Sequence, residues 1–252
     1  MKVLTDEYLS EFVKKNVKKI QRNIKELYID ADENNFEYYL DSSAVFSSNI
    51  EGNSIDLNSY MNSKMLNKKS TGKEYKEIKD LTKAYSFAKE HTLNQKNFLV
   101  AHRIFSKQFL IKSKQGKLRE EKIGLFDSSG LIYVALEPEF VKPETKKLFD
   151  DIEYLNKCDL RVEEVFYYAS LIHLKLAHIH PFMDGNGRAA RLAEKWFLSL
   201  KTGVIAWKIR SEKYYFENRS KYYENINLGQ NYYELNYRKS FPFLEMLSNS
   251  IK

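Results

Sequence analysis

His180-Pro-Phe-Met-Asp-Gly-Asn-Gly-Arg-Ala-Ala-Arg191 is the part of the chain that is most informative about both the expected fold and the expected chemistry. Its two glycines, Gly185 and Gly187, can adopt positive φ and let backbone N–H groups converge on one point. The helix expected to follow adds unpaired N–H groups and the positive end of its dipole at the same place. The segment therefore predicts an anion-binding site where a helix begins.

The side chains of this 180–191 segment suit a polyphosphate. Arg188 and Arg191 are three residues apart, so both can face one concavity from the same side of a helix. Asp184 supplies a hard oxygen ligand of the kind that Mg²⁺ takes together with substrate phosphates. His180 can accept a proton near neutral pH. Any one of these residues would fit an ordinary glycine-rich helix start, but a plain turn does not require all four. The Gly-x-x-x-x-Gly-Lys-Ser/Thr pattern of a P-loop is absent.

The composition of the 252 residues fits a globular protein with an ample core, since 43% are hydrophobic and 14% aromatic. A formal net charge of +7 favours anionic partners without selecting one. The single cysteine, Cys158, excludes an internal disulfide framework and a thiolate zinc site, and is typical of a reducing compartment. The first twenty residues lack the apolar run of a signal sequence, and no stretch approaches the roughly 20 apolar residues that cross a bilayer. We expect a soluble, cytoplasmic protein.

The spacing of apolar residues predicts an all-α fold with one β-hairpin. Apolar side chains recur every three or four residues through most of the chain, and glycine and proline are scarce. Between residues 116 and 138 they alternate instead around the turn Asp127-Ser-Ser-Gly130, which predicts the hairpin. Thr5 is expected to cap the first helix and Pro143 to begin the helix after the hairpin. The expected helices cover about residues 5–27, 35–50, 75–88, 99–110, 143–156, 162–176 and 188–203, with three short ones after 205. The helix over 162–176 is strongly apolar, so we expect it at the centre.

The 180–191 segment resembles the signature of Fic proteins, His-x-Phe-x-(Asp/Glu)-Gly-Asn-Gly-Arg-x-x-Arg, with every specified position filled. It differs from the related Doc-type phosphorylating toxins, in which Asn-Ala-Asn-Lys replaces Asp-Gly-Asn-Gly. The resemblance extends over roughly residues 42–230 and implies a Fic-type helical core with a β-hairpin flap. It divides the chain into an N-terminal helical region (1–90), a core with flap and signature (91–203) and a C-terminal helical extension (204–252).

The resemblance implies transfer of AMP from ATP to a Ser, Thr or Tyr hydroxyl of a target protein. It makes His180 the general base that deprotonates the hydroxyl, and Asp184 the ligand of Mg²⁺. Catalysis would then rest on positioning and electrostatics, as in other phosphate-transfer enzymes. The phosphates of ATP would be held by the same segment, through Asp184, Gly185, Asn186, Gly187, Arg188 and Arg191.

Two further stretches resemble parts of the family's nucleotide pocket. Gly116-Lys-Leu-Arg119 resembles the Gly-x-x-Arg lead into the flap. The flap strand covers the nucleotide and offers an edge to an extended target segment. A single proline, Pro138, follows it where the family often has a Pro-rich stretch. Asn218-Arg-Ser-Lys-Tyr-Tyr223 resembles a segment near the adenine and ribose, so Tyr222 is expected at the nucleotide, with Gln230 as a further candidate. The expected nucleotide contacts of the flap are Ile123, Gly124, Leu125 and Phe126.

Ser47-Ser-Asn-Ile-Glu51-Gly52 is the second informative stretch, because at helical spacing Ser47 and Glu51 share a face and Gly52 can end the helix. Alone it would fit an ordinary helix end. It also resembles the inhibitory (Ser/Thr)-x-x-x-Glu-(Gly/Asn) motif that many Fic proteins place before the core. The resemblance implies that Ser47, Glu51 and Gly52 form a brake, in which Glu51 pairs with Arg191 and takes the place of the γ-phosphate.

The sequence leaves other functions open. The same site could use another nucleotide donor, or remove AMP from a modified protein with Glu51 orienting water. A non-enzyme alternative is a basic nucleic-acid-binding module, although we find no recognised nucleic-acid motif. The expected partners are a target protein docking on the flap and the chain itself as a substrate of self-modification, with a homo-oligomer left open and no membrane partner. His102 and His173 are interpreted as helix residues with local partners.

Overall fold

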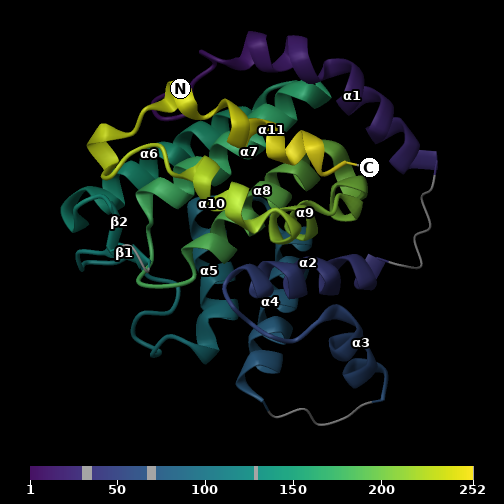
Figure 1. The fold of residues 1–252 in the computed structure, drawn as a ribbon, viewed down its shortest axis with the longest axis vertical. Coiled ribbons are helices and arrows are strands. Elements are labelled where there is room, and N and C mark those ends of the chain that lie inside the picture. Colours follow the sequence, from purple (N-terminus) through teal and green to yellow (C-terminus); the bar gives the residue numbers. More distant parts are fainter. Residues whose placement is uncertain (30–35, 67–71, 128–129, 252) are drawn as a thin grey trace.

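The computed structural model describes residues 1–29, 36–66, 72–127 and 130–251, and most of them are helical (Figure 1). Two strands, β1 (Gly124–Asp127) and β2 (Gly130–Val134), form an antiparallel hairpin. The predicted all-α fold with one hairpin is therefore confirmed. The α-helices are α1 (Leu9–Ile29), α2 (Phe36–Ile50), α3 (Leu57–Met65), α4 (Lys73–Glu90), α5 (Gln95–Phe105), α6 (Pro138–Lys157), α7 (Val162–Ile179), α8 (Asn186–Thr202), α9 (Ser211–Glu217), α10 (Arg219–Ile226) and α11 (Phe241–Asn249). Short 3-10 turns cover Ser106–Gln108, Gly203–Lys208, Tyr232–Glu234 and Tyr237–Lys239.

Helix α7 lies at the centre, as its apolar sequence predicted. It packs along α8 and also contacts α1, α6 and α11, which surround it in Figure 1. Its side chains are buried almost along its whole length, because neighbours cover every face. The main core extends from Leu4 to Ile251, so all three expected regions contribute to it. The division at residues 90 and 203 stays a prediction.

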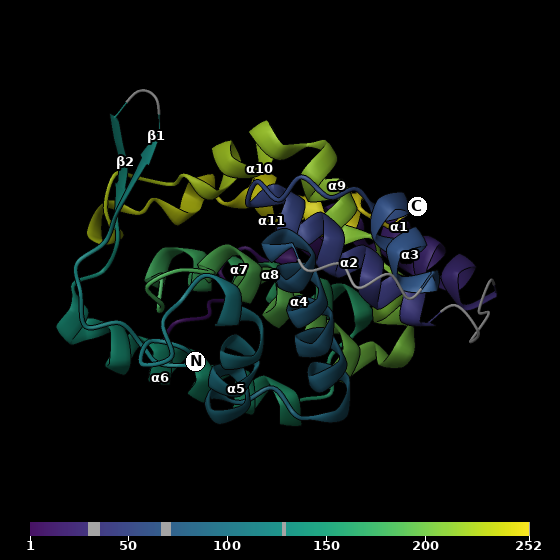
Figure 2. The same cartoon turned by 90° about the horizontal axis from the view of Figure 1, so that it is seen from below.

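The hairpin projects beside the helical body (Figure 2). Leu125 pairs with Tyr133, and Asp127 pairs with Gly130 across the predicted turn. Residues 128 and 129 of that turn lie outside the described residues. The chain after α10 runs along β2, where the Val134 N–H donates to the Gln230 carbonyl at 2.8 Å. The outer edge of β2 is therefore covered at this point.

Three predicted helix limits were wrong. Helix α6 begins at Pro138 and contains Pro143, because the apolar face formed by Val141 and Leu148 continues past the second proline. Pro138 occupies the first turn, where a missing N–H costs nothing. Helix α1 begins at Leu9, since the Thr5 hydroxyl accepts the Glu7 N–H in a turn that precedes it. Helix α5 ends at Phe105 and tightens into the 3-10 turn at 106–108.

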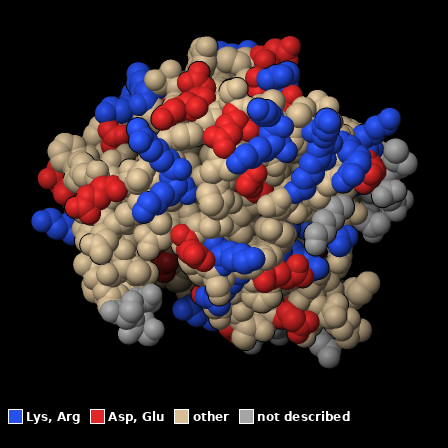
Figure 3. All heavy atoms as spheres, turned by 45° about the horizontal axis from the view of Figure 1, so that its top comes forward, with Lys and Arg blue, Asp and Glu red and all other residues tan. Residues whose placement is uncertain are grey.

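Charged side chains of both signs alternate on the face shown in Figure 3. On α1, for example, Lys15 pairs with Glu11 at 3.0 Å and Arg22 with Glu26 at 4.0 Å. The lysines of this helix thus belong to a solvated, mixed-charge face. Within the described ranges, we find no helix with the length and apolar character that a bilayer crossing requires.

Candidate active site

The 180–191 segment forms the reversal between α7 and α8. His180 ends α7 in the left-handed conformation, with φ 53° and ψ 61°, and it is the one non-glycine residue with positive φ in the described part of the chain. Gly185, with φ 82°, precedes the first residue of α8. The two left-handed residues let the chain turn back sharply, so that the N–H groups that begin α8 face the loop.

The loop is closed on itself by Asn186. Its side-chain oxygen accepts the Phe182 N–H and its amide donates to the Phe182 carbonyl, both at 2.8 Å. The ring of Phe182 is fully buried in the core. The Asn186 side chain therefore shapes the loop, and its contact with phosphates stays a prediction.

Arg191 brings the two sequence motifs together. Its guanidinium is fully buried and donates from Nε to the Ser47 hydroxyl and from Nη2 to the Ser47 carbonyl, each at 2.9 Å. Nη2 also lies 2.6 Å from Oε1 of Glu51. The predicted ion pair between Arg191 and Glu51, and the shared face of Ser47 and Glu51, are thus present.

Glu51 also blocks the glycine cradle. A Cβ built on Gly187 would clash with Oε1 of Glu51, so the carboxylate lies directly against the backbone at the start of α8. Burial alone would raise the pKa of Glu51, but the charges of Arg191 and Arg188 and the bond from Arg191 outweigh burial and lower it. The carboxylate is therefore ionised at neutral pH. Gly52 follows with φ 95°, consistent with its expected place at the helix end.

Arg188 faces the same concavity but is held less tightly. Its guanidinium stacks 3.8 Å from the centre of the Phe109 ring, and its closest carboxylate oxygens, on Glu77 and Asp184, are both 3.7 Å away. The side chain is 8% exposed, and its buried Nε has no hydrogen-bond partner among the residues that the structure describes. Burial lowers the pKa of this guanidinium. An anion entering the concavity would find in Arg188 a cation with unused donors.

The imidazole of His180 is half-buried at the entrance of the loop. Burial lowers its pKa to about 4, and the charge of Arg119 acts in the same direction. Nδ1 lies 3.3 Å from the Ala177 carbonyl, so we assign the proton to Nδ1. Nε2 of a neutral ring is then a proton acceptor at pH 7, as a general base requires.

Asp184 fits the expected Mg²⁺ site as a single-carboxylate ligand. Its side chain is 55% exposed, and Oδ1 accepts the Gly185 N–H at 2.5 Å. In the described ranges we find no cluster of three or more His, Cys, Asp or Glu side chains able to hold a metal ion. This arrangement suits Mg²⁺, which commonly takes one or two protein carboxylates and completes its shell with phosphates and water.

Tyr222 lies behind Arg191, and its expected contact with a nucleotide stays a prediction. Its ring is 1% exposed, and its hydroxyl accepts from Nη1 of Arg191 at 3.0 Å and contacts Nε2 of His173 at 2.9 Å. Its neighbour Tyr223 is 44% exposed and donates to the Ile50 carbonyl at 3.2 Å. Tyr222 thus orients the guanidinium of Arg191. Of the two adjacent tyrosines, Tyr223 has the exposed ring.

Behind Tyr222 lies a buried polar network that the sequence did not predict. Nδ1 of His173 lies 2.7 Å from Oε2 of Glu194, which also accepts the Tyr215 hydroxyl at 2.9 Å. The prediction that His102 and His173 have local partners was therefore wrong. Glu194 and Tyr222 are 21 and 49 residues from His173, and the Asp184 carbonyl is 82 residues from His102. A buried His in an apolar helix was the available signal, but it does not name its partners.

The expected flap contacts lie in or just before β1. The Ile123 carbonyl accepts the Ala135 N–H at 3.0 Å, and Gly124 pairs with Val134. Phe126 is 71% exposed at the outer part of the hairpin. Gln230 holds β2 through its carbonyl while its side chain is exposed. These residues form one unit beside the loop, and their contacts with a nucleotide stay predictions.

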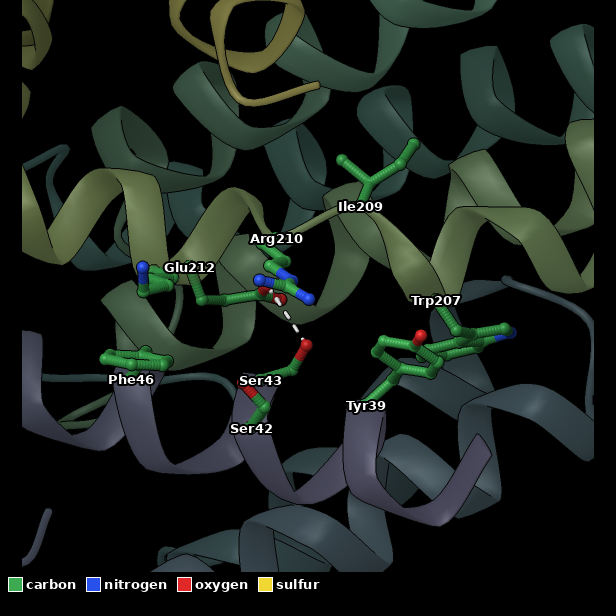
Figure 4. Close-up of a pocket in the computed structure, with 9 residues that line it drawn as sticks. Tyr39, Ser42, Ser43, Phe46, Trp207, Ile209, Arg210 and Glu212 are labelled. Carbon is green, nitrogen blue, oxygen red and sulfur yellow. Dashed lines mark hydrogen bonds between the residues drawn. The ribbon is translucent and has the colours of Figure 1, made fainter. Parts of the chain in front are cut away.

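Two hollows flank α2. The first, between α2 and α9, measures about 10 Å³ and has room for one water (Figure 4). It contains the bond from the Ser43 hydroxyl to Glu212, at 3.1 Å. The second, about 500 Å³ and open, lies at the C-terminal end of α2 between Phe46 and Phe216. Residues of the 180–191 segment line neither of these two hollows.

This loop brings an imidazole, an acid and two guanidiniums together around the N-terminus of α8. The chain matches the Fic/DOC family over residues 73–198, half of its length, and therefore belongs to that family. The protein adenylyltransferase Fic of Drosophila virilis is 51% identical over 62 residues, which are 25% of this chain and 12% of that protein. The namesake of Nematostella vectensis is 39% identical over 75 residues, 30% of this chain and 16% of that protein. The match thus covers a small part of these longer relatives.

Solved structures share the fold across almost the whole chain. A Fic family protein from Desulfovibrio desulfuricans G20 superposes with a TM-score of 0.77 at 19% identity, over 95% of this chain and 71% of that one. A Fic domain containing signaling protein from Bacteroides thetaiotaomicron gives 0.72 at 22% identity, over 94% and 92%. These likenesses confirm the Fic-type fold, including the regions on either side of residues 73–198.

Proposed function

We propose that the chain is a protein adenylyltransferase, which transfers AMP from ATP to a hydroxyl of a target protein and of itself, and which Glu51 inhibits. The observation that carries this proposal is the convergence of His180, Asp184, Arg188 and Arg191 on the N-terminus of α8. The names of the similar Drosophila and Nematostella proteins support the choice of AMP as the transferred group.

In the proposed reaction, Nε2 of His180 removes the proton of the target hydroxyl as its oxygen attacks the α-phosphorus. The new bond joins that oxygen to the α-phosphorus, the bond from the α-phosphorus to the bridging oxygen breaks, and pyrophosphate leaves. Arg188 and Arg191 bind the β- and γ-phosphates, and the N–H groups around Gly187 orient the α-phosphate. Asp184 would hold Mg²⁺, which supplies positive charge to the phosphates when bound.

The proposed inhibition follows from the position of Glu51. Arg191 cannot bind a γ-phosphate with Nη2 while that donor is 2.6 Å from the carboxylate. The carboxylate also lies against Gly187, where a phosphate oxygen would accept backbone N–H bonds. ATP would therefore bind weakly or with its α-phosphate out of line. In the proposed inhibition, the carboxylate of Glu51 and the γ-phosphate, which are both negatively charged, compete for the same place beside Arg191.

Intact-mass spectrometry of the Glu51→Gly protein after incubation with ATP and Mg²⁺ tests the proposal. We expect a mass increment of one AMP in this protein, and none when His180→Ala is added. A mass increment of one phosphate would show that the protein transfers a phosphoryl group and not AMP. A protein that stays unmodified and also leaves candidate targets unlabelled would refute the proposal. Parallel incubations with GTP, CTP and UTP test whether another nucleotide is the donor. Incubation with an AMP-modified protein tests whether the chain removes AMP.

A further inference from the structure

Arg119 is a buried cation whose hydrogen bonds go to backbone carbonyls. It is 2% exposed, and its Nε donates to the His180 carbonyl at 2.7 Å. Its terminal nitrogens donate to the carbonyls of Glu121, Leu136 and Ile179. Its own N–H donates to the Pro181 carbonyl at 2.9 Å. One guanidinium thus joins the end of α7 to the chain on both sides of the hairpin.

These bonds act on the backbone that aims the imidazole. His180 has the left-handed conformation that side chains other than glycine rarely adopt, and such a conformation persists only where its surroundings impose it. Arg119 binds the carbonyls of the residue itself, of the one before it and of the one after it. A planar guanidinium can reach several acceptors at once in a fixed geometry, which an ammonium cannot do.

His102 holds the other end of the loop in the same way. The Gly116 N–H donates to its Nδ1 at 3.0 Å, so Nε2 carries the proton and donates to the Asp184 carbonyl at 3.0 Å. The ring is fully buried and stacks on Phe182 at 3.6 Å between centroids, with 6° between planes. Gly116 has φ 66°, and a Cβ there would lie 2.6 Å from the Leu99 carbonyl. Glycine is therefore required for this approach to His102.

We propose that Arg119 and His102 are positioning residues of the active site, and that the loop from 116 to 119 couples them. Arg119 fixes the backbone of His180, and His102 fixes the backbone at Asp184. The loop lies four residues before β1, so the flap and the backbone at both His180 and Asp184 are held by one connected set of bonds. The catalytic part of this proposal rests on the proposed adenylyl transfer, and the positioning part does not.

The catalytic test compares double variants in the Glu51→Gly protein. Arg119→Lys keeps the positive charge but loses the planar guanidinium that binds several carbonyls at once. We therefore expect kcat to fall at least tenfold. The Kd for ATP should change less than threefold, since Arg188 and Arg191 are unchanged. The matched control is Arg161→Lys at the exposed start of α7, where Arg161 pairs with Glu164. We expect it to leave both values unchanged. A folded Arg119→Lys protein with normal kcat, or with kcat and ATP affinity lost in parallel, would overturn the assignment.

His102 is tested through Mg²⁺ dependence. His102→Phe keeps the stacking surface and removes both hydrogen bonds, so we expect the Mg²⁺ concentration for half-maximal rate to rise at least fivefold. His102→Gln can accept and donate in the same places, so it should restore part of the effect. The control is His91→Phe, because His91 is exposed and also stacks on a phenylalanine, Phe87. An unchanged Mg²⁺ dependence in folded His102→Phe would exclude this role.

Hydrogen exchange without nucleotide tests positioning independently of any transfer. We expect faster amide exchange over residues 180–187 in Arg119→Lys and His102→Phe, and unchanged exchange in the two controls. Equal exchange in all four proteins would overturn the positioning role. Faster exchange in a protein that transfers nothing would retain positioning and refute the proposed function alone.

Discussion

Replacing Glu51 by glutamine removes the charge of the proposed brake and almost nothing else. Two unit charges 4 Å apart interact by about 4 kcal/mol at an effective dielectric constant of 20. The pair lies at 2.6 Å, but desolvation and the 30% exposure of the Glu51 side chain reduce its net value. A charged hydrogen bond contributes about 1.5–3 kcal/mol, and each 1.4 kcal/mol is a factor of ten. We therefore expect Glu51→Gln to raise the rate of AMP transfer about 10–100-fold.

The assay is the initial rate of self-labelling with α-labelled ATP, measured in parallel with the Kd for ATP. Glu26→Gln is the matched control, because Glu26 also pairs with an arginine, Arg22, but on the exposed face of α1. We expect its rate to equal that of the unchanged protein. Glu51→Asp should give an intermediate rate, since it keeps the charge and shortens the reach. If Glu51→Gln and Glu26→Gln label at the same rate, the competition argument is refuted.

Three other outcomes follow from the site. His180→Ala in the Glu51→Gly protein should lower the transfer rate by about 10²–10⁴ while ATP still binds, and loss of binding would show that the imidazole does more than accept a proton. The pH–rate profile of Glu51→Gly should be flat from pH 8 to 6, because burial lowers the pKa of His180 to about 4; a fall centred near 6.5 would contradict this. Burial likewise lowers the pKa of His178 from 6.5 to about 4, so the unfolded chain binds more protons between these values. His178 alone should therefore contribute a fall of about 3 kcal/mol in the free energy of unfolding from pH 6.5 to 4, so the fall measured by urea denaturation should be smaller by about this amount in His178→Gln.

Local patterns were sufficient for most elements of the fold, but they did not predict α3 (Leu57–Met65). The apolar run at 162–176 predicted the central helix because burial on all faces leaves no polar side, and alternation around Gly130 predicted the hairpin. The limits of α6 were wrong because Pro143 was taken as a start, whereas packing of Val141 extends the helix back to Pro138. Tertiary contacts decided that boundary.

The site was predictable where its residues are close in the sequence. One short segment, from the end of α7 to the start of α8, carries His180, Asp184, Arg188 and Arg191. Their spacing in the sequence was therefore sufficient to predict that they lie together. Their supports come from distant segments: Tyr222 reaches Arg191 over 31 residues and His102 reaches Asp184 over 82. Such partners depend on how helices pack. For this reason the bond between Tyr222 and Arg191 was not predicted from the sequence.

The most direct test is a crystal structure of the Glu51→Gly protein with Mg²⁺ and an ATP analogue that cannot be cleaved between the α- and β-phosphates. We expect Nε2 of His180 to face the α-phosphorus and Arg191 to bind the γ-phosphate at the place vacated by Glu51. A triphosphate bound elsewhere, or an imidazole turned away from the α-phosphorus, would contradict this expectation.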